Sequence, residues 1–70
     1  MPLSFSNIGE TVVISRISGS GAIRKHLTDL GFIAGEEVSV ISKVGDGNLI
    51  VKVKGARIAL DKMLACKIFV

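Results

Sequence analysis

Residues 36–54 read EEVSVISKVGDGNLIVKVK, and this stretch decides the fold. In its first half, 36–43, two valines share one face, which is typical of a strand. The Asp46-Gly47 pair then indicates a tight hairpin turn. The side chains of residues 49–54 alternate between two faces, as in a strand. The expected buried face holds Val38, Val40, Leu49, Val51 and Val53, and the opposite face of the second half holds Ile50, Lys52 and Lys54.

Further strands are predicted on both sides of this hairpin. Residues 11–17 (TVVISRI) are rich in β-branched side chains and predict one strand. Downstream, residues 57–60 (RIAL) predict a short strand, and 66–70 (CKIFV) predict a terminal strand that Cys66 opens as a small core thiol. Asp61 predicts the N-cap of one helical turn between them.

One helix interrupts the strands. Ile23, Leu27 and Leu30 recur at helical spacing within residues 22–30, and Gly31 stands where a left-handed C-cap ends a helix. The order is therefore strand, helix and four short strands. This order predicts a mostly β chain, a single domain over residues 1–70, built as a partly closed barrel of about five short strands with one inserted α-helix.

The composition limits the class of protein. The chain has 70 residues, of which 49% are hydrophobic and 21% charged, with one cysteine. These values exclude a disordered chain and a disulfide scaffold. A domain of this size has a marginal core, so most aliphatic side chains are needed inside, and a binding module is favoured over an enzyme with a large cleft. The net charge of +3 is spread without a block, and no stretch resembles a signal or a membrane span.

The sequence holds little that could carry chemistry. His26 is the only imidazole and Cys66 the only thiol, and they lie far apart in the chain. No metal-ligand spacing and no glycine-rich phosphate loop is present. We therefore expect no catalytic residue, no cofactor and no metal site. One alternative stays open, in which His26 with Cys66 or Asp29 holds a divalent metal as a small sensor.

A contact surface for another protein is predicted around the helix. Arg24 and Lys25 place positive charge on the helix, and Phe32 and Ile33 follow in a turn where at least one of them should be exposed. Exposed apolar groups beside charges can mark a protein-contact site. Alternatively, the helix covers the open end of the barrel, and these residues form its lid.

Nucleic-acid binding is the alternative function. Lys52 and Lys54 share a strand face, and Arg57 follows, so the three side chains could meet phosphates. Small barrels commonly stack bases on exposed aromatic rings, however, and this chain has three Phe, expected mostly in the core, and no Tyr or Trp. The composition therefore makes nucleic acid the second hypothesis.

The chain resembles a known family over essentially its whole length. Residues 27–40 (LTDLGFIAGEEVSV) are similar to the leucine–glycine–turn–glycine–strand core of the ferrous iron transport protein A (FeoA) family. The basic helix at 23–27 agrees, and the ending, with IAL at 58–60, Ala65 and IFV at 68–70, is similar to the family's terminal pattern. Members often carry proline where this chain has Ala34.

The resemblance implies an SH3-like small β-barrel and a role without enzymatic activity or cofactor. It implies a cytoplasmic accessory protein of ferrous iron uptake that binds the GTP-binding iron permease FeoB at the inner face of the cell membrane. No nucleic-acid partner is then expected. Arg24, Lys25, Phe32 and Ile33 become the expected contact residues. Short strand edges and surplus apolar residues leave room for weak self-association.

Overall fold

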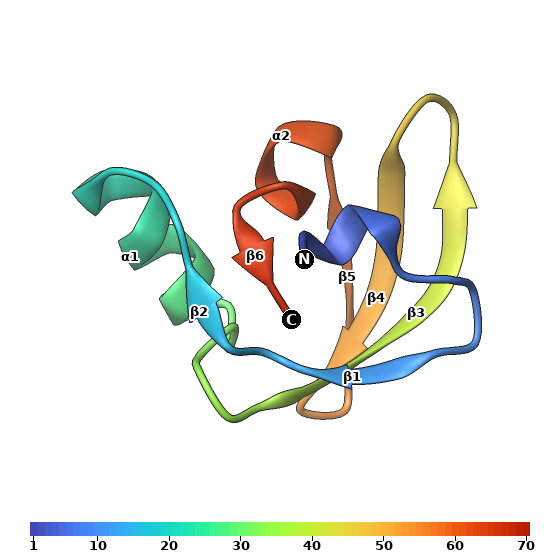
Figure 1. Ribbon diagram of the computed structural model, residues 1–70, viewed down its shortest axis with the longest axis horizontal. Helices are drawn as coiled ribbons and strands as arrows, with labels where there is room; N and C mark the ends of the chain where they lie inside the picture. The colour runs from blue at the N-terminus through green and yellow to red at the C-terminus, as the bar shows by residue number, and fades with distance from the viewer.

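Two small antiparallel sheets and one projecting helix form the fold of the computed structural model, which describes residues 1–70 (Figure 1). One sheet has four strands in the order β1-β3-β4-β5, and the other pairs β2 with β6. The elements in chain order are the 3-10 helix η1 (Leu3–Phe5), β1 (Thr11–Val13), β2 (Arg16–Ile17), α1 (Gly21–Asp29), β3 (Glu37–Val44), β4 (Asn48–Val53), β5 (Ala56–Leu60), α2 (Lys62–Ala65) and β6 (Ile68–Phe69).

The predicted β3–β4 hairpin is confirmed, with the expected valines inside. Val38 pairs with Val53 and Val40 with Val51, and all four are buried. At the tip, Gly47 has a φ of +99°, and a Cβ there would lie 2.9 Å from the side chain of Lys62. Glycine is therefore needed at this position both for the turn and for the close approach of α2.

The predicted strand over 11–17 is two strands in the structure. β1 pairs with β3 in the larger sheet, whereas β2 pairs with β6 in the smaller one. Between them lies the buried Ile14, whose N–H donates to the Glu36 carbonyl at 3.0 Å and whose carbonyl accepts from the Gly35 N–H at 2.8 Å. Both bonds continue the pairing of β1 with β3, and the change of sheet follows at Ser15, whose N–H donates to the Phe69 carbonyl at 2.7 Å. The fold thus has six short strands, and no pairing joins β5 to the β2–β6 sheet.

The end of the chain differs from the expected strand over 66–70. The strand covers only Ile68–Phe69, because α2 and its C-cap occupy the residues before it. Asp61 is the N-cap as predicted, and its carboxylate accepts from the Leu64 N–H at 2.8 Å. Cys66 is the C-cap, so its thiol is exposed, 3.6 Å from the Ser4 hydroxyl. The prediction of a core thiol is wrong for this reason.

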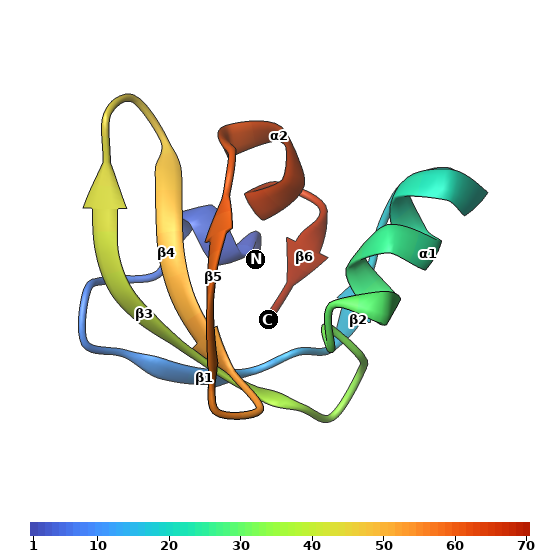
Figure 2. The ribbon, with the colours of Figure 1, turned by 180° about the vertical axis from the view of Figure 1, so that it is seen from behind.

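The buried apolar side chains of both sheets form one core cluster. Helix α1 stands at one side of the sheets, as both views show (Figures 1 and 2). The ends of the chain lie together, because the Met1 and Val70 backbones exchange hydrogen bonds of 3.0 and 2.9 Å. No helix has the length and apolar character that crossing a membrane requires. The buried apolar residues are Leu3, Ile14, Ile17, Leu27, Phe32, Val38, Val40, Leu49, Val51, Val53, Leu60, Ala65 and Ile68.

Candidate functional site

Helix α1 presents two different faces. Leu27 is fully buried, and Ile23 and Leu30 pack half-buried against the core, so the apolar stripe predicted from the sequence is the inner face. Arg24 and Lys25 are exposed, as predicted. The helix is thus attached through one stripe and leaves its basic residues in solvent.

The two basic residues of α1 differ in their partners. The Lys25 Nζ lies 3.6 Å from the Asp29 carboxylate one turn later, and the two side chains are 80% and 64% exposed. An ion pair this exposed contributes little stability, because solvent screens it. The Arg24 guanidinium has no carboxylate partner. Its backbone is engaged instead, since the Arg24 N–H donates to the Ser20 carbonyl at 2.9 Å and the Arg24 carbonyl accepts from the Thr28 hydroxyl at 2.8 Å. Arg24 therefore offers the freer positive charge.

The exit of α1 explains where Phe32 goes. Gly31 has a φ of +106° and its N–H donates to the Thr28 carbonyl, while the Phe32 N–H donates to the Leu27 carbonyl, both at 3.0 Å. This pair of bonds is a Schellman motif, which brings the residue after the glycine back onto the last turn of the helix. Phe32 is accordingly 0% exposed. Its expected place on the contact surface is wrong, and Phe32 is a core residue.

Ile33 remains at the surface, 38% exposed. Its carbonyl accepts from the Glu36 N–H at 3.1 Å, which closes a turn with Gly35 at a φ of +90°. The turn forms with Ala34, without the proline that the resemblance leads us to expect there. We call Arg24, Lys25 and Ile33 the α1 surface. It keeps the two expected charges and one of the two expected apolar side chains.

The residues of the metal-sensor hypothesis are not brought together. His26 and Asp29 belong to α1, whereas Cys66 ends α2. The structure holds no group of three or more His, Cys, Asp or Glu residues that could hold a metal ion. A divalent sensor needs such a group of ligands. The geometry therefore gives the sensor hypothesis no support.

The basic residues of the nucleic-acid hypothesis are only partly assembled. Lys52 on β4 and Arg57 on β5 stand directly opposite each other and are exposed. Lys54 lies in the following turn. Its Cδ is 3.5 Å from the position that a Cβ on Gly31 would occupy. The structure thus makes a basic pair on the outer face of the sheet, with the third side chain directed towards the helix exit.

The three phenylalanines have three different surroundings. Phe32 is in the core, as expected, but Phe5 is 69% exposed on η1. Phe69 is half-buried, and the Arg16 guanidinium lies 4.1 Å from the centre of its ring. The expectation that most of them are core residues is wrong, because η1 turns Leu3 inward and Phe5 outward. None of the three lies on the strands that carry the basic pair.

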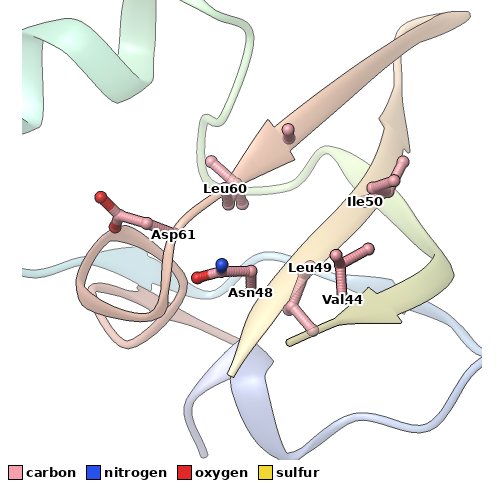
Figure 3. A pocket seen from close by; sticks show the side chains of 7 residues that line it. Val44, Asn48, Leu49, Ile50, Leu60 and Asp61 are labelled. Carbon is pink, nitrogen blue, oxygen red and sulfur yellow. The ribbon is translucent and has the colours of Figure 1, made fainter. Parts of the chain in front are cut away.

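An apolar pocket that the sequence did not predict lies where the β3–β4 hairpin meets the end of β5 (Figure 3). Its volume is about 300 Å³, and it is open to solvent on one side. Asn48 ties this end of β4 to α2, since its side-chain oxygen accepts from the Lys62 N–H at 3.2 Å. The lining side chains are Val44, Leu49, Ile50, Ala59 and Leu60, with Asn48 and Asp61 at the polar end.

Comparison with known proteins places this fold. A model of the FeoA domain matches residues 1–70. A Methanocaldococcus jannaschii protein named "Putative Fe(2+) transport protein A" is 37% identical over 70 residues, which cover 99% of this chain and 83% of that protein. A crystal structure of the iron uptake regulatory protein FeoA superposes with a TM-score of 0.89 at 29% identity, over 97% of this chain and 91% of the other.

A second solved structure is that of Stenotrophomonas maltophilia FeoA complexed with zinc, described as a procaryotic SH3 domain protein. Its TM-score is 0.83 at 32% identity, and the match covers 97% of this chain and 86% of the other. The expected SH3-like fold is therefore confirmed, although strand pairing leaves the barrel open beside β5. Family model, relative and fold agree over essentially the whole length, and the chain belongs to the FeoA family.

Proposed function

We propose that this protein is a non-enzymatic accessory of ferrous iron uptake that binds the cytosolic part of the GTP-binding iron permease FeoB. The observation that carries the proposal is the family match over residues 1–70. The name of the M. jannaschii relative supports iron transport, and the description of the S. maltophilia protein offers a role as a ferrous iron transport activating factor. The protein acts in the cytoplasm, at the inner face of the membrane when bound.

The α1 surface is the contact we propose. Helix α1 projects from the rest of the molecule, so a partner can reach Arg24 and Lys25 without touching the core (Figure 1). Unpaired surface charge steers an oppositely charged partner and acts on the rate of association. Ile33 adds an exposed apolar side chain at the exit of the helix. Together these residues fit an acidic surface with an apolar spot.

Binding to the full-length permease in detergent tests this proposal. Arg24→Glu is expected to weaken binding by about fivefold, equivalent to about 1 kcal/mol, and to slow association more than it speeds dissociation. The matched control is Lys43→Glu, which changes the net charge equally at an exposed position on β3. Repeating the titration with and without GTP shows whether binding depends on the nucleotide state.

The outcomes separate the partner from the surface. If the permease binds the wild-type chain and both variants alike, the accessory role stands and the α1 surface is wrong. If the wild-type chain fails to bind the full-length permease at low and high salt, with and without GTP, the proposed partner is wrong.

A further inference from the structure

Strand β5 is an edge strand with an unused side. It pairs with β4 alone, and no backbone hydrogen bond outside that pairing uses Arg57 or Ala59. The β4–β5 turn has two residues, Lys54 and Gly55, with φ values of +51° and +79°. Such a turn makes the flanking Val53 and Ala56 a hydrogen-bonded pair, and the pairs alternate along the strands.

Arg57 and Ala59 therefore direct their N–H and C=O groups away from β4. We call these groups the β5 edge. The side chains beside it leave room for another strand, because Ala56 and Ala59 are small and exposed. In Figure 2, β5 lies at the front of the sheet, with no strand paired on its outer side. An unpaired edge of this kind is a template for an added strand.

The face beside the β5 edge carries two adjacent positive charges, and the exposed Glu37 on β3 of the same face forms no ion pair with them. Lys52 and Arg57 are direct cross-strand partners, and like charges in that arrangement repel each other. No carboxylate pairs with either, since the one ion pair of the molecule is on α1. The row continues through Ser39 to Thr11, whose hydroxyls hydrogen-bond each other at 2.9 Å. A carboxylate placed beside Lys52 and Arg57 would relieve their repulsion.

The pocket shown in Figure 3 lies beside the Lys52–Arg57 pair, towards the end of β5. Ala59 and Ile50 are cross-strand partners, two positions beyond Arg57 and Lys52, and both line the pocket. Alternate residues of an extended chain point to the same face. A strand added at the β5 edge therefore places one side chain beside the basic pair and the side chain two residues away beside the apolar pocket.

We propose that the β5 edge binds an acidic peptide as an added strand. The peptide backbone pairs with Arg57 and Ala59, a carboxylate lies at Lys52 and Arg57, and an apolar side chain two residues along enters the pocket. This interaction goes beyond the proposed iron-transport role and uses none of the residues of the α1 surface.

Charge argues for such a peptide over a second copy of this chain. Antiparallel pairing of two β5 edges places two Lys52–Arg57 pairs on one face of the joined sheet, which adds repulsion and relieves none. Nucleic acid fits less well, because no aromatic ring stands on β4 or β5 to stack a base, and only two cations share the face.

The test is a titration of the full chain with a fluorescein-labelled peptide, Thr-Thr-Glu-Thr-Val-Thr-Thr. The control peptide has Lys in place of Glu. We expect the acidic peptide to bind about tenfold tighter than the basic one, and the Arg57 and Ala59 amides to exchange more slowly in the complex. Equal affinity for the two peptides, or unchanged exchange at both amides, overturns the proposal.

Two variants and one control locate the site. Arg57→Glu should lower the affinity for the acidic peptide by about tenfold. Ala59→Pro should abolish binding, because it removes an edge N–H that no strand of the protein uses. Lys43→Glu is the charge-matched control and should bind normally. If Ala59→Pro does not fold, Arg57→Glu and Lys52→Glu decide, and unchanged affinity in both overturns the proposal.

Two further arms address the other occupants. Single-stranded oligothymidine that binds more tightly than the acidic peptide, with the same loss in Arg57→Glu, assigns the face to nucleic acid and overturns the proposal. Sedimentation of the free chain as a dimer that Ala59→Pro dissociates assigns the edge to self-association and likewise overturns it.

Discussion

The β3–β4 hairpin and helix α1 are held to the molecule in opposite ways. The hairpin has paired strands on both sides, β1 and β5, and buries four valines. Helix α1 joins no sheet, and Leu27 is its one fully buried residue. The hairpin is thus fixed by many contacts spread along its length. The helix depends on a single stripe and on the Schellman motif at its exit.

This difference separates the firmly packed part of the molecule from the part that presents exposed charges to a partner. Buried, doubly paired strands open last when a protein fluctuates, whereas an element with few buried contacts opens first. The exposed charges of α1 therefore stand on the least anchored element. The proposed β5 edge is the reverse case, because its backbone groups belong to the anchored sheet and only their outer side is free.

The largest expected effect comes from Phe32, which joins the helix exit to the core. Phe32→Ala should lower the free energy of unfolding by about 3–5 kcal/mol, because a fully buried ring is removed. Chemical denaturation measures this loss, and Ile33→Ala is the neighbouring control, expected to cost under about 1 kcal/mol. A small loss for Phe32→Ala would return Phe32 to the surface and undo the distinction between the two residues.

A substitution at Gly31 measures how much the C-cap of α1 contributes to stability. Gly31→Ala should cost about 1–2 kcal/mol, because its φ of +106° strains a residue with a Cβ, while the nearest side-chain atom is 3.5 Å away and leaves space. Gly21→Ala, in the same helix with nothing within 4 Å of its Cβ position, should leave stability unchanged or raise it. Equal thermal melting temperatures for the two variants would contradict the capping role.

Lys54, in the β4–β5 turn, also has a positive φ, and there a substitution is expected to raise stability. Its φ of +51° falls at the first central position of the β4–β5 turn, where Asn is favoured over Lys. Lys54→Asn should raise the free energy of unfolding by about 0.5–1 kcal/mol. A fall in stability would mean that the contact of the Lys54 side chain with Gly31 outweighs the backbone strain.

The smallest effect is expected at the ion pair on α1. Lys25→Ala should change stability by less than about 0.5 kcal/mol, because both partners are largely exposed. The same variant should slow association with the permease if the α1 surface is the contact. A large stability loss would show that the ion pair anchors the helix, contrary to the expectation that Lys25 serves only as an exposed contact residue.

The sequence predicted the parts of the fold in which local pattern and tertiary packing agree. Alternating valines, the stripe Ile23–Leu27–Leu30 and the Asp61 cap each need only neighbouring residues to be recognised. The exchange of partners after Ile14 was missed, because a β-branched run does not say which strand it will pair with. The exposure of Cys66 was missed because the helical turn ends at Ala65 as expected, but Cys66 then serves as its C-cap and the strand begins only at Ile68.

The burial of Phe32 could have been predicted from the glycine that precedes it. Gly31 was recognised as a left-handed C-cap, and the residue that follows such a glycine often packs against the helix three residues before its cap. The basic pair Lys52–Arg57 could be foreseen as two charges, but not as cross-strand partners. The register that joins them depends on the length of the β4–β5 turn.

The hydrogen bonds between Met1 and Val70 make the backbone almost a closed ring. A short peptide linker between these residues would complete the ring with little strain. A closed loop of this length removes about 4 kcal/mol of chain entropy from the unfolded state. The ring could then be reopened at the exposed tip of the β3–β4 hairpin, yielding a circular permutant that keeps α1 and β5 intact.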